Sequence, residues 1–338
     1  MAQSGGAGKH RGAASERRRR AGNGGAMSVV ITGASSGIGR ATALAFAEEG
    51  ANLTLAARRG GKLAEVAREC ERRGGRAQYL ETDVTSAEAM RGLADAAIRR
   101  YGRVDVWVND AGVGAVGRFT DVPIQAHEQT INTNLIGYIH GAHAILPHFQ
   151  QRRHGTLINV VSFGAFVAPP FAAAYAASKF GLRGFSESLR GELQDYPDIH
   201  ICDIFPGFVD TPGIVHGANY TGHEIHAKAP DRPETVARAI VRVAHDPRDK
   251  TSVGPIAKLV PLAYAVAPGL GRWIMARFMQ VGLSRTPPQA PTPGNLFRPV
   301  PDHLPPSQRR GRATVGAGGL AALLVAVAGT ALVYGRRL

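Results

Sequence analysis

The chain has 338 residues, of which 44% are hydrophobic and 20% are charged, enough for one large domain or two small ones with a proper core. This composition excludes a disulfide-stapled miniprotein and a wholly disordered chain. The 40 lysines and arginines exceed the 26 aspartates and glutamates, which gives a formal net charge of +14. Cys70 and Cys202 are too few for a disulfide framework and indicate a reducing compartment.

Much of the basic charge lies at the two ends of the chain. Residues 1–27 hold six basic residues against Glu16, and residues 297–338 hold six arginines against Asp302. The first 27 residues are otherwise mainly Gly, Ala and Ser, so they have little to bury, and a disordered basic tail is expected. No apolar run follows its basic residues, so the tail is not a secretory signal. Nucleic-acid binding is the alternative for this tail. A solvated tail is favoured, and no nucleic-acid partner is expected.

From Ser28 onward, short apolar runs alternate with longer segments of helical period. The apolar runs predict strands at 28–32, 52–57, 77–81, 104–109, 156–162 and 200–205. The segments between and after them predict helices at 38–49, 63–73, 87–101, 124–150, 172–194 and 234–244. A repeated strand–helix–strand order makes a parallel sheet, and right-handed crossovers cover both of its faces. The expected fold class over residues 28–250 is α/β, a doubly wound Rossmann sheet that binds ligands at the carboxyl ends of its strands.

Residues 251–308 are predicted to form a C-terminal extension. Pro255, Pro261 and Pro268 interrupt its apolar part and exclude one continuous membrane-spanning helix there. Its second part, 268–283, predicts an amphipathic helix that serves as packing or as a substrate lid, with a membrane-surface element as the alternative. Eight prolines in the remainder indicate an extended linker.

The segment 313–334 has no charge and follows this linker. As a helix it would be about 33 Å long, enough for a bilayer core of about 30 Å. Three arginines just before it and two just after it favour a transmembrane helix over a buried terminal helix. The sequence therefore predicts that residues 309–338 form a single-pass C-terminal membrane anchor, with the catalytic domain facing the cytoplasm.

A glycine-rich loop, Thr-Gly-Ala-Ser-Ser-Gly-Ile-Gly, joins the first predicted strand to the first predicted helix. Gly33 permits a sharp turn, Gly37 lets the backbone approach a pyrophosphate, and Gly39 lets the helix pack close to the strand. The phosphates then meet the positive end of the helix dipole. Such a loop can also be a mere connection, but the strand before it and the helix after it predict a dinucleotide site.

The end of the second predicted strand indicates which dinucleotide is bound. An NAD site has an acidic side chain there for the adenosine 2′-hydroxyl, and this chain has Ala57. Arg58 can bind a 2′-phosphate through two parallel hydrogen bonds, and Arg40 adds a second positive charge. A solvated pair at a helix start is the alternative for Arg58 and Arg59. We expect NADP(H) in preference to NAD(H).

Three residues further along indicate the chemistry. Lys179 follows Tyr175 by four positions, so both lie on one helix face, and a nearby cation lowers the pKa of a phenol from about 10 toward neutrality. Such a tyrosine can act as a general acid or base. Ser162 ends the fifth predicted strand, where its hydroxyl can hold a substrate carbonyl oxygen. A Tyr-x-x-x-Lys pair alone is usually a surface contact, but the upstream loop makes it specific.

With these motifs the chain resembles the short-chain dehydrogenase/reductase family, in the branch with a Thr-Gly-x-x-x-Gly-x-Gly loop and a Tyr-x-x-x-Lys active site. The resemblance covers about residues 28–244. It implies that Tyr175 transfers the proton and that Ser162 orients the carbonyl. It also implies that Lys179 binds the nicotinamide ribose and tunes Tyr175. Asn134 would shape a helix kink that holds a proton-relay water.

The resemblance supplies further cofactor contacts. Asp83 and Val84 resemble the adenine contact, and the segment 206–211 resembles the one beside the nicotinamide carboxamide. The turn at 109–112 reads Asn-Asp-Ala-Gly where the family usually has Asn-Asn-Ala-Gly, so Asp110 is a departure. The expected cofactor-binding residues are Gly33, Ser35, Ser36, Gly37, Ile38, Gly39, Arg40, Arg58, Asp83, Val84, Asn109, Ala111, Gly112, Tyr175, Lys179, Pro206, Gly207, Val209 and Thr211.

The predicted function is hydride transfer between a nicotinamide and a carbonyl or alcohol carbon. The apolar run Phe163–Phe171, beside a predicted membrane anchor, indicates a lipophilic substrate. Simple packing of the turn by these side chains is the alternative. A catalytically silent NADPH-sensing scaffold at a membrane is the alternative function, and the four intact residues Asn134, Ser162, Tyr175 and Lys179 argue against it.

Two further expectations concern metals and partners. The histidine pairs 140/143 and 223/226 lack the spacing of zinc hydrolases, so no metal site is expected. The family resemblance implies a homo-oligomer that associates through the predicted helices 124–150 and 172–194.

Overall fold

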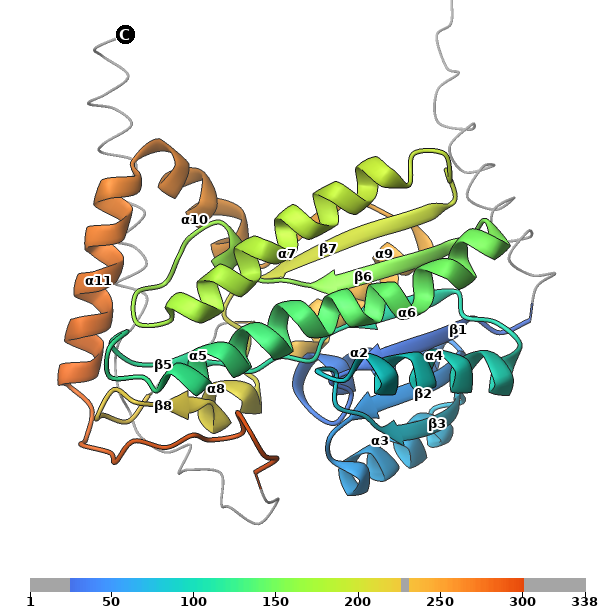
Figure 1. The fold of residues 1–338 in the computed structure, drawn as a ribbon, viewed down its shortest axis with the longest axis horizontal. Helices are drawn as coiled ribbons and strands as arrows, with labels where there is room; N and C mark the ends of the chain where they lie inside the picture. Colours follow the sequence, from blue (N-terminus) through green and yellow to red (C-terminus); the bar gives the residue numbers. More distant parts are fainter. Residues whose placement is uncertain (1–24, 226–230, 301–338) are drawn as a thin grey trace, which may run out of the picture.

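A parallel sheet forms the centre of the computed structural model, which describes residues 25–225 and 231–300 (Figure 1). In the described residues its strand order is β3-β2-β1-β4-β6-β7-β9. The strands are β1 (Ser28–Thr32), β2 (Asn52–Ala57), β3 (Arg76–Glu81), β4 (Val106–Asn109), β6 (Gly155–Val160), β7 (Ile199–Pro206) and β9 (Lys250–Val253). The order reverses at β1, which pairs with β2 on one side and with β4 on the other. The predicted doubly wound sheet is present, with β9 as an edge strand that the sequence analysis missed.

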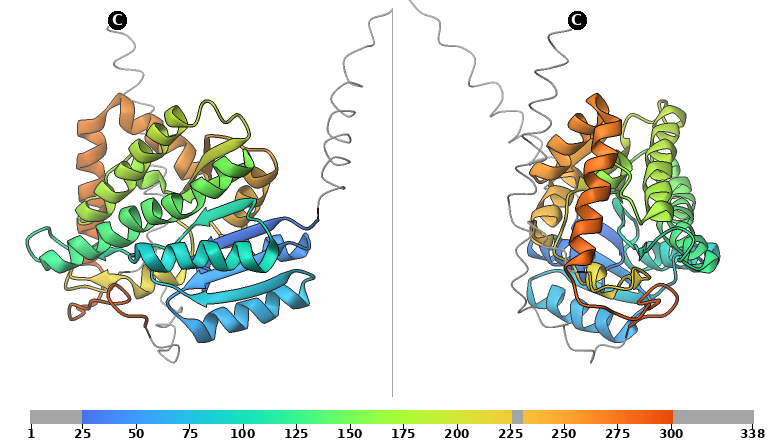
Figure 2. Two further views of the ribbon diagram at one scale, coloured as in Figure 1. Left: turned by 45° about the vertical axis from the view of Figure 1, so that its right-hand side comes forward. Right: turned by 90° about the vertical axis from the view of Figure 1, so that its left-hand side faces the viewer.

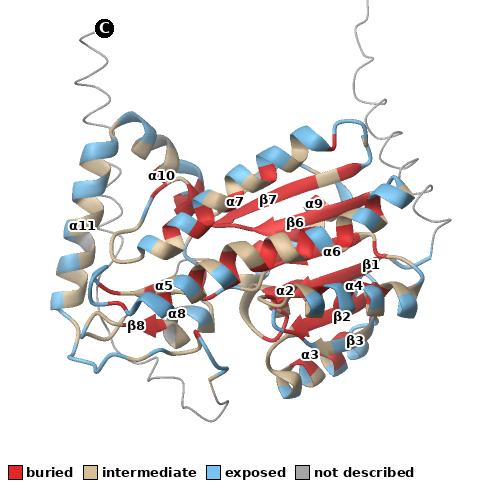
Figure 3. Cartoon of the chain, in the orientation of Figure 1, coloured by how far each residue is buried: buried red, intermediate tan, exposed pale blue. Residues whose placement is uncertain are grey.

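The central strands are buried along most of their length because the sheet is covered on both faces. In β1, Val29, Val30 and Ile31 are each fully buried. Val29 and Ile31 join one hydrophobic cluster, and Val30 joins a second one on the opposite face. This alternation follows the two-residue period of a strand, and burial of both faces explains the continuous apolar runs. Figure 3 shows the buried strands between helices whose outer sides are exposed.

Two sets of helices supply the rest of these clusters (Figure 2). The first face is covered by α2 (Gly37–Glu48), α3 (Gly60–Arg72) and α9 (Pro233–His245). The second face is covered by α4 (Ala87–Tyr101), α6 (Gly137–Arg152) and α7 (Ala173–Glu192). The predicted helix boundaries agree with these to within a few residues.

The helix predicted over 124–150 is interrupted. It consists of α5 (Ile124–Ile131), a π-helical turn (Asn132–Ile136) and α6. A π-helical turn is a local distortion of an α-helix that often lies at a functional site.

The C-terminal part returns across the carboxyl edge of the sheet. Here lie α8 (Pro212–His216) and a small parallel sheet of β5 (Ala115–Val116) and β8 (Ala218–Asn219). Residues 286–300, which we call the C-terminal strap, run below β8 and α8 as the dark orange trace in Figure 1. The strap was predicted to be an extended linker. It is extended, but it packs against the domain: Asn219 and Thr292 exchange two backbone hydrogen bonds of 2.8 Å.

The predicted C-terminal transmembrane helix is corrected by the structure. The last described helices are α10 (Pro255–Val266) and α11 (Pro268–Ser284), with 12 and 17 residues. Their lengths are about 18 and 26 Å, short of a bilayer core of about 30 Å, and α10 contains Pro261. Across residues 25–225 and 231–300, none of the helices has both the length and the apolar character that crossing a bilayer requires.

For the part of the chain that the structure describes, the corrected fold class is therefore a Rossmann-like parallel sheet with helices on both faces, without a membrane-spanning helix. The single-pass membrane localisation and the cytoplasmic orientation of the domain depended on that helix, and both are withdrawn with it. The segment predicted as the anchor, 309–338, and most of the predicted basic tail, 1–24, lie outside the described residues.

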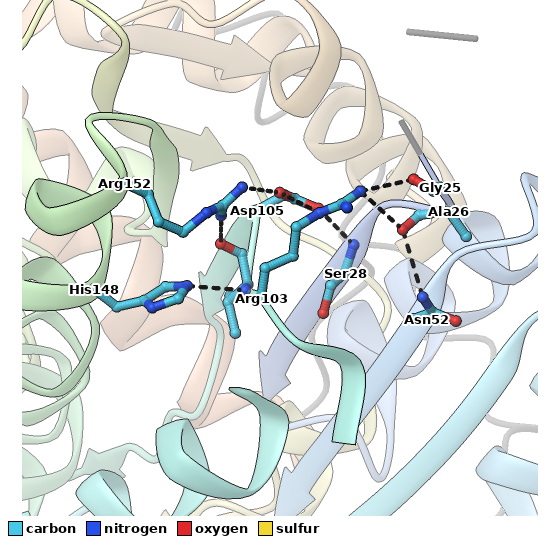
Figure 4. A network of polar contacts seen from close by, with 9 residues as sticks. Gly25, Ala26, Ser28, Asn52, Arg103, Asp105, His148 and Arg152 are labelled. Atoms are coloured by element: carbon cyan, nitrogen blue, oxygen red, sulfur yellow. Dashed lines mark hydrogen bonds and ion pairs between the residues drawn. The ribbon is translucent and has the colours of Figure 1, made fainter. Parts of the chain in front are cut away.

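A charged cluster at the amino edge of the sheet joins β1, the start of β4 and the end of α6 (Figure 4). The Asp105 carboxylate accepts hydrogen bonds from the Ser28 N–H (2.9 Å), from Arg103 Nε (3.0 Å) and from Arg152 Nη2 (3.1 Å). Burial alone would raise the pKa of the Asp105 carboxyl. The hydrogen bonds from Ser28, Arg103 and Arg152 outweigh burial and lower this pKa below its ordinary value.

We expect Asp105→Ala to lower the free energy of unfolding at pH 7 by about 3 kcal/mol, because two guanidinium groups lose their shared partner. The carboxylate contributes stability above its unfolded pKa of about 3.9, and this contribution is lost as the pH falls through the lower folded pKa. Urea unfolding at pH 7 and pH 3 measures both effects. Asp95→Ala, at an exposed site on α4, is the control. Equal stability of the two variants at pH 7 would contradict the assignment.

Candidate active site

The loop between β1 and α2 has the geometry of a phosphate cradle. Gly33 has a φ of +71°, and a Cβ there would lie 2.9 Å from backbone atoms of Asp110 and Ala111. A Cβ on Gly39 would lie 2.5 Å from the Gly33 carbonyl oxygen. Only glycine fits both positions. Because α2 begins at Gly37, its N-terminal N–H groups are presented at this loop. The residues present fit a dinucleotide pyrophosphate.

Arg58, which directly follows β2, is held by the C-terminal strap. Its Nη2 donates to the Asn295 carbonyl oxygen (2.6 Å), and its Nη1 donates to the carbonyl oxygens of Leu296 and Phe297 (3.3 Å each). Burial lowers the pKa of Arg58 from its ordinary value, and the Asp83 carboxylate acts in the opposite direction. These strap contacts were not foreseen from the sequence, because they join residues 237 or more positions apart.

Two more arginines flank the glycine-rich loop. Arg59 Nη2 donates to Ser35 Oγ (3.1 Å) and to Ser36 Oγ (2.9 Å), so Arg59 ties the end of β2 to the loop. Arg40 forms a 2.5 Å ion pair with Glu69, which partly offsets the positive charge expected there. The sequence analysis chose Arg40 and passed over Arg59. The adjacency of Arg59 to Arg58 was the only available signal.

Two cavities follow the path expected for the cofactor. One of about 300 Å³ adjoins the glycine-rich loop, and Ser35, Ser36, Gly37 and Arg40 are among its lining residues. The second, of about 420 Å³, lies at the carboxyl ends of β2 and β3. It is lined by Arg58, Glu81, Thr82, Asp83, Phe297 and Pro299. We call this second cavity the adenosine cavity. Two of its six lining residues belong to the strap.

The Tyr-x-x-x-Lys pair lies in the first turns of α7. Lys179 is 4% exposed, and its Nζ donates to the Val160 carbonyl oxygen at the end of β6 (3.2 Å). The same Nζ lies 5.8 Å from the centre of the Tyr175 ring and 5.1 Å from the centre of the Tyr138 ring. The structure therefore brings the ammonium group beside two phenols at the carboxyl edge of the sheet.

Ser162 follows β6 and lies against the same tyrosine. Its Oγ accepts a hydrogen bond from the Gly164 N–H (3.0 Å). A Cβ on Gly164 would lie 3.3 Å from both Ser162 Oγ and Tyr175 Cε1, so the serine hydroxyl and the phenol ring are close neighbours. The two groups can contact the same small polar atom of a substrate.

Asn134 occupies the π-helical turn and is fully buried. Its Oδ1 accepts from the Val113 N–H (2.9 Å), and its Nδ2 donates to the Val113 carbonyl oxygen (2.8 Å). Nδ2 also lies 3.4 Å from Ser178 Oγ on α7. Asn134 thus links the distorted helix, the segment after β4 and the helix that carries Tyr175.

Burial dominates the protonation of this site. It lowers the pKa of Lys179 to about 8, and the Asp110 carboxylate opposes that shift. Burial also raises the pKa of Tyr175, while a hydrogen bond with Ser162 acts in the opposite direction. The sequence analysis expected a lowered tyrosine pKa. The direction here is the reverse because burial of the phenol disfavours its charged form.

Asp110 is the main site residue that the sequence analysis undervalued. Burial raises the pKa of its carboxyl to about 8, against the charge of Lys179 and a hydrogen bond from the Gly39 N–H. Thr32 Oγ1 accepts from the N–H groups of Asp110 (3.1 Å) and Ala111 (3.3 Å), which holds the turn against β1. The signal was its departure from the family's usual Asn-Asn-Ala-Gly.

Asn109 belongs to a buried chain of polar side chains. Trp107 Nε1 donates to Asn109 Oδ1 (2.8 Å), and Asn109 Nδ2 donates to Asn159 Oδ1 (3.0 Å). Asn159 Nδ2 donates to Ser186 Oγ (3.1 Å), which donates to Asp203 Oδ1 (2.7 Å). Asn109 is 1% exposed, and its side chain joins β4, β6, β7 and α7 through this chain of hydrogen bonds.

The other predicted cofactor residues lie around the same edge. Asp83 Oδ1 accepts from the N–H (2.9 Å) and hydroxyl (2.8 Å) of Thr85. The Val84 carbonyl oxygen accepts from His140 Nδ1 (3.0 Å). A Cβ on Gly37 would lie 3.3 Å from the Thr211 side chain, which brings the segment after β7 to the glycine-rich loop.

The segment around that threonine is held by neighbouring backbone. The Gly207 N–H, directly after Pro206 at the end of β7, donates to the Val253 carbonyl oxygen (3.2 Å). Val209 is 6% exposed and forms a β-bridge with Asp231. A Cβ on Gly112 would lie 3.6 Å from Asn134 Oδ1.

The aromatic residues after Ser162 are largely packing residues. Phe163 and Val167 are buried in a cluster with Ile256 and Val260 of α10. The Phe208 ring packs edge-on against Phe163, with the ring centres 5.0 Å apart, and remains 40% exposed. The packing alternative therefore applies to Phe163 and Val167, and Phe208 is the exposed aromatic beside them.

Comparisons with known proteins agree with this geometry. The family model described as short chain dehydrogenase matches residues 27–217. Uncharacterized oxidoreductase YxnA of Bacillus subtilis is 35% identical over 255 residues, which cover 74% of this chain and 72% of that protein.

Two solved structures are similar in fold. A short chain dehydrogenase/reductase from Burkholderia phymatum in complex with NAD has a TM-score of 0.65 and 24% identity, over 73% of this chain and 95% of that one. An alcohol dehydrogenase from Thermococcus sibiricus complexed with 5-hydroxy-NADP has a TM-score of 0.58 and 26% identity, over 67% of this chain and 95% of that one.

Proposed function

The chain belongs to the short-chain dehydrogenase/reductase family, and we propose that it is an NADP(H)-dependent member that interconverts a carbonyl and an alcohol. The family resemblance in the sequence is confirmed, and the chain is an oxidoreductase whose fold binds a nicotinamide cofactor. The observation that carries the finer proposal is the pair of Tyr175 and the buried Lys179 beside Ser162, at the sheet edge that holds the glycine-rich loop.

Each of these side chains has a proposed role in carbonyl reduction. Ser162 and Tyr175 orient the substrate carbonyl oxygen with their hydroxyl groups, and Tyr175 donates its proton to that oxygen. Lys179 binds the nicotinamide ribose and supplies a positive charge beside the phenol. The nicotinamide, when bound, supplies the hydride for reduction or accepts it in the reverse direction. Asn134 holds the π-helical turn, and a proton-relay water is proposed to lie beside it.

Several features support a preference for NADP(H). β2 ends without an acidic residue, at Ala57, and Arg58 lies in the adenosine cavity. Arg59 adds a second guanidinium at the loop. A 2′-phosphate is held well by two parallel guanidinium hydrogen bonds, whereas a 2′-hydroxyl favours a carboxylate acceptor. The ion pair of Arg40 with Glu69 makes Arg40 the weaker candidate.

We further propose a substrate with an apolar body, such as a hydrophobic ketone or alcohol. Support comes from Phe208, which remains 40% exposed beside Phe163, and Phe163 directly follows Ser162. Apolar and aromatic walls with a few polar groups are typical of sites for small organic ligands.

The proposal includes a homo-oligomer formed through α5, α6 and α7. Ile124 on α5 is 59% exposed, and Phe180 on α7 is 41% exposed. Burial of these large apolar side chains against a second copy would remove them from water.

The reaction is tested with Tyr175→Phe in the full-length chain. We expect turnover of a panel of hydrophobic ketones and aldehydes with NADPH to fall by a factor of about 100 to 10,000, the usual contribution of an acid–base group. NADPH binding should be retained, because phenylalanine keeps the ring. NADPH oxidation and NADPH affinity are measured side by side. Tight binding without turnover by the unmodified protein on the whole panel, in either direction, would instead indicate a silent sensor.

The coenzyme preference is tested with Arg58→Ala. We expect the KM for NADPH to rise by about tenfold or more, because a charge-assisted bidentate contact is lost, while the KM for NADH changes little. Arg68→Ala, at an exposed arginine on α3, is the matched control. An equal effect of Arg58→Ala on both coenzymes would contradict recognition of the 2′-phosphate by Arg58.

The pH dependence of reduction tests the role of Lys179. Because burial lowers the pKa of Lys179 to about 8 and raises that of Tyr175, the ammonium loses its proton first as the pH rises. We expect kcat/KM to be about tenfold lower one pH unit above that pKa. In Asp110→Asn this alkaline limb should move to lower pH, because the Asp110 charge favours the ammonium. Asp121→Asn, at an exposed position, is the control. An unmoved limb would contradict the coupling.

A further inference from the structure

The C-terminal strap runs from the segment after β8 to Arg58 after β2, along the carboxyl edge of the sheet where the cofactor is expected. It leaves α11 and pairs with the segment after β8, where the Gln289 N–H donates to the Gly222 carbonyl oxygen (2.9 Å). Further on, the Asn295 N–H donates to the His216 carbonyl oxygen (2.8 Å) at the end of α8. The strap then reaches Arg58 after β2. It therefore follows a fixed path along the carboxyl edge and ends at the adenosine cavity.

The strap is anchored by packing as well as by backbone bonds. Leu296 is fully buried in a small cluster that includes Val113 and Val122, separate from the two main clusters of the sheet. Gly294 has a φ of +49°, and a Cβ there would lie 2.3 Å from the His216 carbonyl oxygen. The close approach of the strap at Gly294 requires glycine. The three carbonyl groups that follow are thus held at fixed positions.

Those carbonyl groups bind one side of the Arg58 guanidinium. Asn295 binds Nη2, and Leu296 and Phe297 both bind Nη1. In the described part of the chain these bonds use the Nη atoms, and none of them uses the Nε–H. A guanidinium held in this way still presents its Nε and Nη2 hydrogens as a parallel pair, the geometry that binds phosphate through two bonds.

A further group of the strap fits the adenosine part of a dinucleotide. The Phe297 ring is 46% exposed and lines the adenosine cavity together with Pro299 and with Glu81, Thr82 and Asp83.

We propose that the C-terminal strap is part of the coenzyme site: the carbonyl groups of Asn295, Leu296 and Phe297 orient Arg58 for a 2′-phosphate, and the Phe297 ring closes the adenosine cavity. This inference rests on the proposed NADP(H) preference and adds a specificity element outside the region matched by the family model, residues 27–217. The strap holds the Arg58 side chain in place before the coenzyme binds. Less side-chain freedom is therefore lost on binding.

The opposite role is that the strap competes with the coenzyme for Arg58. The two roles predict opposite effects of loosening the strap. If the strap orients Arg58, loosening weakens binding of a 2′-phosphate. If it competes, loosening strengthens that binding.

The experiment measures binding of 2′,5′-ADP and of 5′-ADP to the full-length protein by calorimetry. Leu296→Ala removes the buried anchor and should weaken 2′,5′-ADP binding by about tenfold but 5′-ADP binding by only about twofold, because the loss concerns the 2′-phosphate contact. Phe297→Ala leaves the anchor in place and should weaken both ligands equally, by about fivefold to tenfold, as the loss of a base-stacking aromatic does. Pro291→Ala, at an exposed strap position, is the matched control and should change neither affinity.

Thermal unfolding of each variant shows whether it is folded, and Phe297→Ala provides the test on an exposed side chain if Leu296→Ala is not. Tighter 2′,5′-ADP binding by Leu296→Ala, or unchanged affinities in both variants, would overturn the proposal. Equal affinities of the unmodified protein for the two ligands would contradict the proposed coenzyme preference instead. In that case the strap is tested by the affinity of Phe297→Ala for 5′-ADP alone. An unchanged affinity would show that the strap is not part of the coenzyme site.

Discussion

A buried chain of hydrogen-bonded side chains determines how the active-site helix sits on the sheet. It runs from Trp107 and Asn109 on β4 through Asn159 on β6 to Ser186 on α7 and Asp203 on β7. A buried polar group left without its partner costs about 1–3 kcal/mol, so these elements cannot shift against one another without breaking such bonds. The proposed catalytic pair lies on α7, and its distance from the glycine-rich loop depends on this register. Apolar packing alone would allow more sliding, because it has no direction.

The electrostatics of the site follow from the same burial. Lys179 lies where water is excluded, between two phenol rings and a backbone carbonyl. Desolvation brings its pKa and that of Asp110 to about 8, from opposite sides. The site therefore holds an acid and a base that change charge in the same range of pH. Asp110 lies at a turn where the family usually has an asparagine. Because Asp110 and Lys179 each shift the pKa of the other, their protonation states are coupled.

The C-terminal extension adds α10 and the strap to the family fold, and both pack at the carboxyl edge of the sheet. The core that the family model matches ends at residue 217, whereas the strap and α10 lie beyond it. α10 packs against Phe163 and Val167 beside the proposed substrate site, and the strap reaches Arg58 at the proposed adenosine site. The two ends of the expected cofactor path are thus enclosed by one continuous part of the chain. This arrangement explains why a proline-rich segment is packed here instead of serving only as a connection.

The sequence by itself determined what depends on neighbours within a few residues. Periodicity predicted six strands and the main helices, and the spacing of glycines, Ser162, Tyr175 and Lys179 predicted the family and the candidate site. Local patterns also misled: the apolar segment 313–334 predicted a membrane anchor, and no helix of the described residues can serve as one. Only the tertiary structure decided the π-helical turn, the direction of the tyrosine pKa and the partners of Arg58. These features depend on burial and on contacts between residues far apart in the chain. A short stretch of sequence does not contain both of the residues that form such a contact.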